Sequence, residues 1–370
     1  MKKILVFMDS FNTGGITNVA NSIYQNLDRT KFSMDFMRRT APDQTMDTEV
    51  QKNGDRVYFY KIESLNKIPF FNYLISEARC VKQIVRTLKN EKYDVIHIHA
   101  HPNVALKAAK KLNIPTRIMH VHEAVTDFNG NEKKSKITNI IWKRRQRMYN
   151  TLATVKAGDS MRACSAKFGS IKDCTVIYPS FDMEKFSAQN YSKDLTQKKY
   201  NIDDASFNMV HVGRLSYIKN QPFMLDILKE INKGKKADLY IVGEGRIKDE
   251  LLQYAKKLGV LGNVHFLPKT TPPDIYTKMD CSLLPSFSEA FGMVAVESQL
   301  MDVACFASTN VPEDVDIGMC TFLDLEKGAK YWADCILNYD YENMHIDENE
   351  KNKFDIKTII KDVEGLYAGL

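Results

Sequence analysis

The sequence predicts an α/β protein made of two doubly wound parallel sheets in tandem. Two observations lead to this fold class. Short apolar stretches typical of buried strands alternate with helical stretches along both halves of the chain. The chain is also 370 residues long, which favours two domains over one. Two such domains would face each other across a cleft, with ligands bound at the carboxyl ends of both sheets.

The first half of the chain alternates strand and helix signals in order. Short apolar runs predict strands, and apolar residues at i, i+3, i+4 and i+7 predict helices, as in Leu74–Leu88. Strands are expected at 4–8, 32–37, 57–60, 94–98 and 117–121, and helices at 16–27, 74–88 and 105–112. Connections of helical length between strands indicate a parallel sheet.

The second half repeats this scheme after a polar, Lys-rich linker expected between Tyr178 and about Asp204. Strands are expected at 209–212, 239–242, 264–267, 281–284 and 304–307, with helices at 223–231, 247–258 and 356–370. We therefore expect an N-terminal domain of residues 1–180 and a C-terminal domain that begins at residue 181.

Composition and charge narrow the class of protein. Hydrophobic residues make up 44% of the chain and charged residues 26%, and no apolar run reaches the roughly 20 residues of a membrane span. The seven cysteines are scattered without a Cys-x-x-Cys pair, which argues against a disulfide framework and fits the cytoplasm. Residues 1–180 contain 30 Lys/Arg against 16 Asp/Glu, a net charge of +14, whereas the rest carries −8. The first half therefore either meets an anionic partner or has a solvated basic face.

A pair of cations follows the first strand of the second half. Arg214 and Lys219 lie five residues apart in the sequence Gly-Arg-Leu-Ser-Tyr-Ile-Lys-Asn-Gln, between strand and helix. A guanidinium and an ammonium at the crevice end of a sheet suit a diphosphate and would stabilise its departure as an anion. Two solvated surface cations are the alternative, and the position at the turn favours function.

A pair of carboxylates follows a later strand. Glu289 is expected on the loop before a helix and Glu297 about one and a half turns into that helix. The amides of Phe291, Gly292, Met293 and Val294 would form the first turn of this helix and could hold phosphate. Without its setting, the pair could equally be a helix-dipole partner and an exposed helix residue.

Two glycine motifs lie at other turns between strand and helix. Gly14 and Gly15 would let a phosphate approach the start of the first helix, although a tight turn alone would also need glycine. No G-x-G-x-x-G occurs, so a dinucleotide fingerprint is absent from the sequence. The glycines of Gly243-Glu244-Gly245 are expected only to make a turn.

Histidines alternate along two expected strands of the first half, at positions 97, 99 and 101 and at 120 and 122. Alternate residues share a face, which raises metal binding as a possibility. Against it, His97 belongs to a strand expected to be buried, and the sequence shows no cluster that completes a coordination set. We therefore expect no metal. His122 follows the end of a strand, where a hydrogen-bonding or acid–base histidine is useful.

A basic stretch in the first half predicts an amphipathic helix. Lys136, Lys143, Arg144 and Arg147 can share faces of this helix, with Ile137, Ile140, Ile141 and Met148 on another. Such a helix is typical of contact with an anionic membrane surface, and a surface helix packed through its isoleucines is the alternative.

With these motifs in place, the chain resembles glycosyltransferase family 4, the retaining enzymes of GT-B fold, and most of all the bacterial subgroup for capsular and exopolysaccharides. The similarity is most specific in the second half. There Gly-Arg-Leu-x4-Asn-Gln, Val-Gly-Glu-Gly and Glu-x7-Glu occur in the expected order. GT-B implies two Rossmann-like domains and a C-terminal helix that crosses back to the N-terminal domain. The resemblance thus implies that the helix at 355–370 joins the N-terminal domain, and that the C-terminal domain comprises residues 181–354.

The resemblance implies a role for each motif. Arg214 and Lys219 would hold the donor diphosphate with Gly14, Gly15 and the amides after Glu289, which itself would bind sugar hydroxyls. Glu297 would bind the ribose, and His122 the donor sugar. The base pocket is implied at Phe266, Leu267 and Pro268. The implied reaction transfers a sugar from a nucleotide sugar, UDP-linked in our expectation, without a metal or other cofactor.

The implied acceptor is a glycan or a polyprenyl-diphosphate-linked sugar at the inner face of the plasma membrane, and nucleic acid is not an expected partner. Two departures from the family pattern concern the hinge between the domains and the sugar pocket. Tyr178-Pro-Ser-Phe-Asp stands where Asn-Gly-Ile-Asp is common, and Ala290 stands where glycine is common. A nucleotide-sugar epimerase or phosphorylase of the same fold, or a non-catalytic nucleotide-sugar or polyanion-binding protein, remain alternatives.

Overall fold

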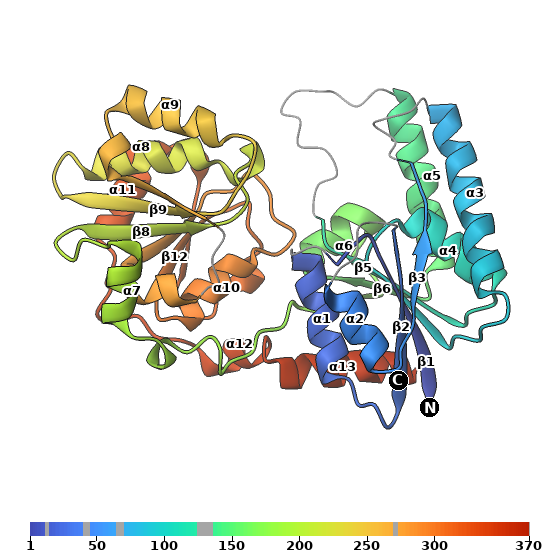
Figure 1. Cartoon of the computed structure of the whole chain (residues 1–370). Helices are drawn as coiled ribbons and strands as arrows, with labels where there is room; N and C mark the ends of the chain where they lie inside the picture. Colours follow the sequence, from blue (N-terminus) through green and yellow to red (C-terminus); the bar gives the residue numbers. More distant parts are fainter. Residues whose placement is uncertain (12–14, 40–44, 64–69, 124–135, 269–272, 370) are drawn as a thin grey trace. The chain divides into compact units, whose positions relative to one another are not determined.

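The computed structural model describes residues 1–11, 15–39, 45–63, 70–123, 136–268 and 273–369. The chain divides into two compact units (Figure 1). The N-terminal unit is Met1–Ser180 with Ile356–Leu370, and the C-terminal unit is Phe181–Asp355. Each unit is built on one parallel sheet with helices packed against it. The predicted α/β fold class is therefore confirmed.

The N-terminal unit contains a seven-stranded sheet in the order β3-β2-β1-β4-β5-β6-β7. Its strands are β1 (Lys2–Met8), β2 (Phe32–Arg39), β3 (Val57–Tyr60), β4 (Val95–Ile98), β5 (Thr116–Val121), β6 (Val155–Gly158) and β7 (Cys174–Val176). Its helices are α1 (Gly15–Asn26), α2 (Thr45–Lys52), α3 (Phe70–Leu88), α4 (Pro102–Lys111), α5 (Lys136–Leu152), α6 (Met161–Phe168) and α13 (Ile356–Ala368). The central strands are apolar along almost their whole length because helices cover both faces of the sheet.

The C-terminal helix α13 packs on the N-terminal unit, as expected. Its buried side chains, Ile356, Ile359, Val363 and Tyr367 among them, join the core formed with Ile4 of β1. At the far end of the helix, Lys2 Nζ donates to the carbonyl of Ala368 at 2.6 Å. The last helix is therefore a structural part of the N-terminal unit.

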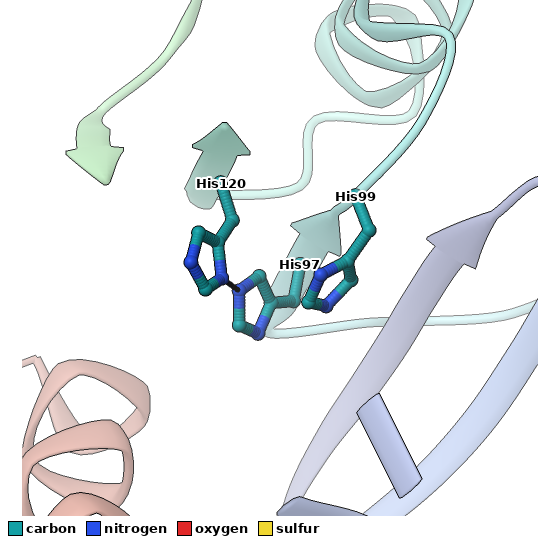
Figure 2. A group of neighbouring side chains, drawn as sticks. All are labelled: His97, His99 and His120. Carbon is teal, nitrogen blue, oxygen red and sulfur yellow. Dashed lines mark hydrogen bonds between the residues drawn. The ribbon is translucent and has the colours of Figure 1, made fainter. Parts of the chain in front are cut away.

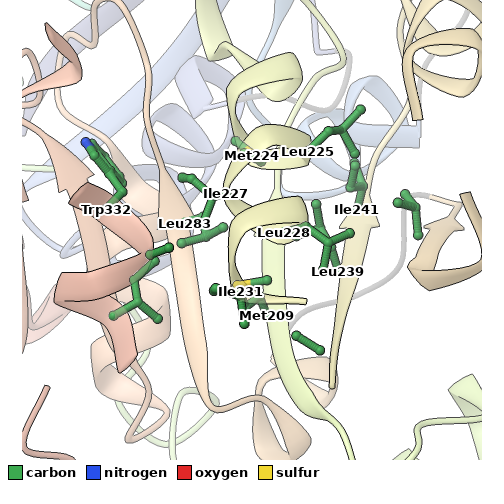
Figure 3. Close-up of a cluster of buried hydrophobic side chains, with 14 of the residues drawn as sticks. Met209, Met224, Leu225, Ile227, Leu228, Ile231, Leu239, Ile241, Leu283 and Trp332 are labelled. Atoms are coloured by element: carbon green, nitrogen blue, oxygen red, sulfur yellow. The ribbon is translucent and has the colours of Figure 1, made fainter. Parts of the chain in front are cut away.

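The C-terminal unit contains a six-stranded sheet in the order β10-β9-β8-β11-β12-β13. Its strands are β8 (Phe207–Val212), β9 (Ala237–Val242), β10 (Val264–Leu267), β11 (Cys281–Leu284), β12 (Ala304–Ser308) and β13 (Cys320–Leu323). Its helices are α7 (Lys193–Tyr200), α8 (Gln221–Ile231), α9 (Lys248–Leu258), α10 (Met293–Leu300), α11 (Gly328–Leu337) and α12 (Glu348–Asn352). Figure 3 shows Leu228 and Ile231 of α8 in the core above β8 and β9, and the fully buried Trp332 of α11 belongs to the same cluster.

The segment expected to be a linker is partly a folded element of the C-terminal unit. Residues 193–200 form α7, whose N-cap Ser192 accepts a hydrogen bond from the amide of Leu195. Phe186, Tyr191 and Tyr200 pack against the cluster around Val210. The polar, Lys-rich composition of this segment therefore reflects an exposed helix face and not an unstructured connection.

Both sheets change winding direction once, and these points position the candidate site. In the N-terminal unit the reversal lies between β1 and β4, and in the C-terminal unit between β8 and β11. At such a switch point the connections leave in opposite directions, so the carboxyl ends of the two strands border a crevice where ligands bind in open α/β sheets. The Arg214–Lys219 loop follows β8 and the Glu289 loop follows β11.

Candidate active site

The two cations lie at the carboxyl end of β8. Arg214 is exposed, and no hydrogen bond or ion pair engages its guanidinium within the described part of the chain. Its carbonyl accepts from Gln221 Nε2 at 2.9 Å, which fixes the turn into α8. Lys219 ends a short 3-10 helix, Tyr217–Lys219, and its side chain is 21% exposed. The structure therefore leaves one cation open to solvent and shields the other.

Lys219 and Glu289 form an ion pair across the β8/β11 switch point. Lys219 Nζ donates to Glu289 Oε1 at 2.5 Å, and Ser286 Oγ donates to the same oxygen at 2.6 Å. The two loops are also joined by their backbones, since the amide of Phe287 donates to the carbonyl of Ile218 at 2.8 Å. Two motifs that are 70 residues apart in the sequence therefore form one rigid, charged group.

The Gly243-Glu244-Gly245 motif supports the Arg214 loop from the neighbouring strand. The amide of Leu215 donates to the carbonyl of Glu244 at 2.9 Å, so pairing continues beyond β8 and β9. A Cβ on Gly245 would lie 2.0 Å from the carbonyl oxygen of Leu215, and one on Gly243 would lie 2.0 Å from that of Gly213. These glycines are needed for close approach of two backbones, which is more than the turn expected from sequence.

Gly245→Ala is therefore expected to destabilise the protein by about 1–3 kcal/mol, because backbone must move to admit the methyl group. Urea unfolding of the variant measures this loss. Gly262→Ala is the matched control, since a Cβ there meets nothing within 4 Å. Equal unfolding midpoints for Gly245→Ala and wild type would show that the two loops are not held together in this way.

Glycine also starts α10. Gly292 is the N-cap residue with φ 112°, a conformation that favours glycine, and a Cβ there would lie 3.1 Å from Val311 Cγ1. Phe291 is buried, while Met293 and Val294 are half-buried at the first turn. Amides of a first helical turn lack partners within the helix and can bind an anion. The predicted helix start is thus present directly after the Glu289 loop.

Glu297 lies inside α10, one turn beyond these amides, and differs in character from Glu289. Burial raises the pKa of its carboxyl group to about 7, although part of the residue reaches solvent and the charge of Lys185 acts in the opposite direction. Among the described residues, no hydrogen bond engages this carboxyl, and the hydroxyl of its neighbour Tyr276 is also unpartnered. The partly exposed Glu297 carboxyl and the buried Tyr276 hydroxyl, both without partners, indicate a place for hydroxyl-bearing ligand atoms.

The stretch expected to form the base pocket lies on the edge strand β10. Phe266 and Leu267 are half-buried and Pro268 is exposed. The carbonyl of Leu267 accepts from the amide of Gly243 at 3.1 Å, which links this edge to the glycine motif. Lys248 Nζ lies 5.8 Å from the centre of the Phe266 ring.

In the N-terminal unit, His122 is more enclosed than its position in the sequence suggests. Its side chain is 3% exposed. Nδ1 lies 2.9 Å from Asp159 Oδ2, and Nε2 lies 2.8 Å from His99 Nδ1. A sugar hydroxyl could bond to His122 Nε2 only if it replaced the contact of this atom with His99. Asp159, which sequence reasoning missed, follows β6 and came with no motif that would have marked it.

The histidines of β4 and β5 form one buried cluster (Figure 2). His97 Nε2 and His120 Nδ1 are 3.2 Å apart, and the rings of His97 and His99 lie 4.2 Å apart centre to centre. Burial alone would raise the pKa of the Asp159 carboxyl, but the charges and hydrogen bonds of His122 and His120 hold that pKa well below its usual range. The alternating histidines were recognisable in the sequence, but their carboxylate partner was not, because Asp159 follows a third strand, β6.

A second polar group lies at the β1/β4 switch point and was not predicted. Asp9 lies one residue after β1. Its Oδ1 is 2.9 Å from His101 Nε2, and its Oδ2 accepts a hydrogen bond from the Arg39 guanidinium at 3.0 Å. The hydrogen bond and charge of His101, together with the charge of Arg39, lower the pKa of Asp9, against the effect of its burial. The helix α1 begins at Gly15, whereas Gly14 lies outside the described residues.

The expected basic helix is α5, but its faces differ from the prediction. Lys143, Arg144 and Arg147 are exposed, as expected. Ile140, assigned to the packing face, is 54% exposed, because Arg145 turns inward to pair with Glu77 at 3.2 Å. The side chains of residues 136–138 lie outside the described ones. Across the described ranges, no helix combines the length and apolar character that crossing a membrane requires.

Two family models match the chain. The model of glycosyltransferase family 4 matches residues 13–185, and the model of glycosyl transferases group 1 matches residues 192–314. The first match falls on the N-terminal unit and the second on the C-terminal unit, where it includes the Lys219–Glu289 pair and Glu297.

Relatives and a solved structure agree with these matches. The chain is 24% identical over 346 residues to the glycosyltransferase EpsF of Bacillus subtilis, covering 90% of this chain and 87% of EpsF. It is 21% identical over 377 residues to the capsular polysaccharide biosynthesis glycosyltransferase CapH of Staphylococcus aureus, covering 99% of each. The crystal structure of Anabaena HepE with UDP and glucose aligns over 100% of both chains, with a TM-score of 0.77 and 20% identity.

The two family models match consecutive segments that together cover most of the chain. The solved structures that resemble this chain have the same architecture of two sheets. The chain therefore contains a glycosyltransferase family 4 domain and a glycosyl transferases group 1 domain, and it has the GT-B fold.

Proposed function

We propose that this glycosyltransferase transfers a sugar from a UDP-sugar to a glycan or lipid-linked acceptor in cell-surface polysaccharide synthesis, with retention of the anomeric configuration. The observation that carries this proposal is the Lys219–Glu289 ion pair at the β8/β11 switch point. The complex of HepE with UDP and glucose supports the choice of donor, and the name of CapH supports the polysaccharide product.

The proposed roles follow from the chemistry of each group. Arg214 and Lys219 hold the diphosphate, because their positive charges balance the two charges of this group. Glu289 accepts hydrogen bonds from donor-sugar hydroxyls through the carboxylate oxygen that Lys219 and Ser286 leave available. The first-turn amides of α10 and of α1, beginning at Gly15, add further donors to phosphate oxygens.

The nucleoside is assigned to the remaining groups of the C-terminal unit. Glu297 accepts hydrogen bonds from the ribose hydroxyls, for which its unpartnered carboxyl is suited. Phe266, Leu267 and Pro268 bind the base at the edge of the sheet. With two cations and two helix N-termini on the diphosphate, transfer is proposed to proceed without a divalent metal at that group.

The proposed mechanism is front-face transfer. As the bond between the anomeric carbon and the diphosphate breaks, negative charge grows on the leaving oxygen, and Arg214, Lys219 and the α10 dipole stabilise it. The acceptor hydroxyl attacks from the same face and gives its proton to the leaving phosphate oxygen, so the reaction needs no protein base. His122, oriented by Asp159, is proposed to contact the donor sugar after exchanging His99 for a sugar hydroxyl.

A donor panel tests the proposal. Thermal shift with UDP- and GDP-linked sugars should select one UDP-sugar, and NMR of the transfer product should show the anomeric configuration of the donor. An inverted anomer would refute retention. Epimerised free donor, or turnover that depends on phosphate, would assign one of the other activities found on this fold, and donor binding without turnover would leave a binding protein.

We further propose that the protein is cytoplasmic and contacts the anionic inner face of the plasma membrane through α5. Lys143, Arg144 and Arg147 are exposed on this helix together with Ile140. Exposed basic and apolar side chains on one helix match the requirements of an anionic lipid surface. The acceptor would be a polyprenyl-diphosphate-linked sugar at that surface, and nucleic acid is not proposed as a partner.

Replacement of Lys143, Arg144 and Arg147 by alanine is expected to weaken binding to phosphatidylglycerol vesicles about 100-fold, since each basic residue near such a surface contributes about 1 kcal/mol. Sedimentation with vesicles at low salt measures the partition. The charge-matched control is a triple alanine variant of three exposed lysines of the C-terminal unit, Lys193, Lys198 and Lys229. Equal binding of the two triple variants would exclude α5 as the membrane contact.

A further inference from the structure

Four histidines occupy one face of two adjacent strands in the N-terminal unit. His97 and His99 alternate at β4, and His120 and His122 alternate at β5, which pairs with β4 in parallel. Alternate residues of a strand point to the same face, so the four imidazoles meet beneath the end of the sheet. His97, His99 and His120 are buried, and Figure 2 shows their rings turned toward one another.

The outer contacts of this cluster determine where its protons lie. Asp159 is a carboxylate, which only accepts, so His122 Nδ1 must donate to its Oδ2 at 2.9 Å. A neutral His122 then carries a lone pair on Nε2, which accepts a proton from His99 Nδ1 at 2.8 Å. His99, in turn, is left with a lone pair on Nε2.

The same reasoning applies to His120. Its Nε2 lies 3.0 Å from Asp159 Oδ1, so a proton there faces the carboxylate, and its Nδ1 is a lone pair. His97 Nε2 faces that lone pair at 3.2 Å, while His97 Nδ1 faces the hydroxyl of Tyr367 at 2.8 Å. Since a hydroxyl can donate or accept, Tyr367 allows His97 to present either a proton or a lone pair inward.

Three buried atoms of this network have no hydrogen-bond partner among the described residues. Two of them, His120 Nε2 and Asp159 Oδ1, face each other at 3.0 Å, and the third is His99 Nε2. His99 Nε2 is buried without a hydrogen bond among the described residues, on a side chain that is itself more than nine-tenths buried. An unpaired lone pair in the interior is costly, and native proteins rarely leave one without a reason. Two of the three inward nitrogens are thus fixed as lone pairs, and the third can become one.

We propose that His97, His99 and His120 form a binding site for a divalent transition metal of the zinc class, held through His97 Nε2, His99 Nε2 and His120 Nδ1. One ligand atom from each histidine lies within 4.8 Å of those of the other two. Tetrahedral zinc with Zn–N bonds of about 2.0–2.1 Å separates its nitrogens by about 3.3 Å. The 3.2 Å separation of His97 Nε2 and His120 Nδ1 already matches this value.

The outer shell that such a site requires is also present. Ligating imidazoles normally donate their second N–H to a carboxylate or another acceptor. Here His120 faces Asp159 and His97 faces Tyr367 of α13. His99 faces His122 as long as no donor sugar has taken the place of His99 on that ring.

This ion would reside within the N-terminal unit and would be separate from the donor diphosphate, for which cationic side chains are proposed. The proposal does not rest on the transferase activity. Because Tyr367 belongs to the last helix, the ion would also tie α13 to the sheet. Bound metal should therefore raise the thermal unfolding temperature of the full chain.

Cobalt titration of the full chain tests the site. The protein is purified without a histidine tag, stripped with a chelator and titrated with Co²⁺ alone, whose tetrahedral complexes absorb visible light. One equivalent should saturate the absorption, and Zn²⁺ should remove it and raise the unfolding temperature. His99→Gln should abolish the signal, whereas His265→Gln, a histidine of the C-terminal unit, should leave it unchanged.

Tyr367→Phe provides a second variant that keeps the buried ring. It removes only an outer partner and should weaken cobalt binding about 10–100-fold. Circular dichroism without metal checks that each variant is folded. No saturable absorption in the wild type, or equal affinity in wild type and the His99→Gln and Tyr367→Phe variants, would overturn the proposal. Without saturable absorption, the histidines would be a metal-free network that shares protons. Equal affinities would mean that the cobalt is an adventitious ion only.

Discussion

Replacement of Lys219 by alanine is expected to lower kcat by a factor of about 10²–10³, because the leaving diphosphate would lose a shielded cation at the moment its charge develops. Lys219 is better placed for this than Arg214, since its ammonium is held in one position by Glu289 at 2.5 Å. Steady-state rates at saturating donor measure the effect. Lys229→Ala, an exposed lysine on α8, should leave kcat unchanged.

The partner variant shows whether the pair acts as a unit. Glu289→Ala removes the group that positions Lys219 and also a proposed ligand of the sugar hydroxyls, so its loss of kcat should be of similar size. The double variant should lose little more than either single variant, since neighbouring residues of one network are not additive. Folded single variants with undiminished turnover would refute the assignment of this pair to the donor.

Periodicity predicted the central elements well, and short or polar elements poorly. The expected strand at 209–212 corresponds to β8, and the expected helix at 223–231 to α8. By contrast, β7 contains only three residues, none of them buried, so it carries no apolar run to detect. The helix α7 was missed for a related reason, because its eight residues have a single buried side chain, Thr196.

The sequence predicted those features of the candidate site that follow from the order of the strands. It did not predict the direct contacts between side chains. That Arg214 and Glu289 follow strands of one parallel sheet could be inferred from spacing, because parallel strands end at the same edge. The direct bond from Lys219 to Glu289 could not, since it depends on how the two loops pack. The role of Asp159 could not be predicted for the same reason, because its partners His122 and His120 come from another strand.

Glu297→Gln is expected to stabilise the protein at pH 8 and not at pH 4.5. The folded carboxyl has a pKa of about 7, against the ordinary value of 4.5, so folding favours the protonated form. Below pH 4.5 the carboxyl is protonated in both the folded and the unfolded state, so it does not reduce the free energy of unfolding. Between pH 4.5 and 7 folding must take up a proton, so wild-type stability falls with rising pH and then levels off. The difference in unfolding temperature between variant and wild type should grow across this window.

The same substitution should weaken the binding of the donor, with a pH dependence of the opposite sense. Ribose hydroxyls donate to the ionised carboxylate, so bound donor lowers the pKa of Glu297, and wild-type affinity should rise as pH increases through 7. Hydrogen bonds to a charged group contribute about 1.5–3 kcal/mol, so Glu297→Gln should bind about 10–100-fold more weakly at pH 8. At pH 5.5 the two affinities should converge, because the wild-type side chain is then neutral. Calorimetry with a nucleotide sugar, whose diphosphate diester keeps its charge over this range, measures both curves. A variant that follows the wild-type pH dependence would place the ribose elsewhere, and Glu297 would then be a buried acid that destabilises the fold without binding the donor.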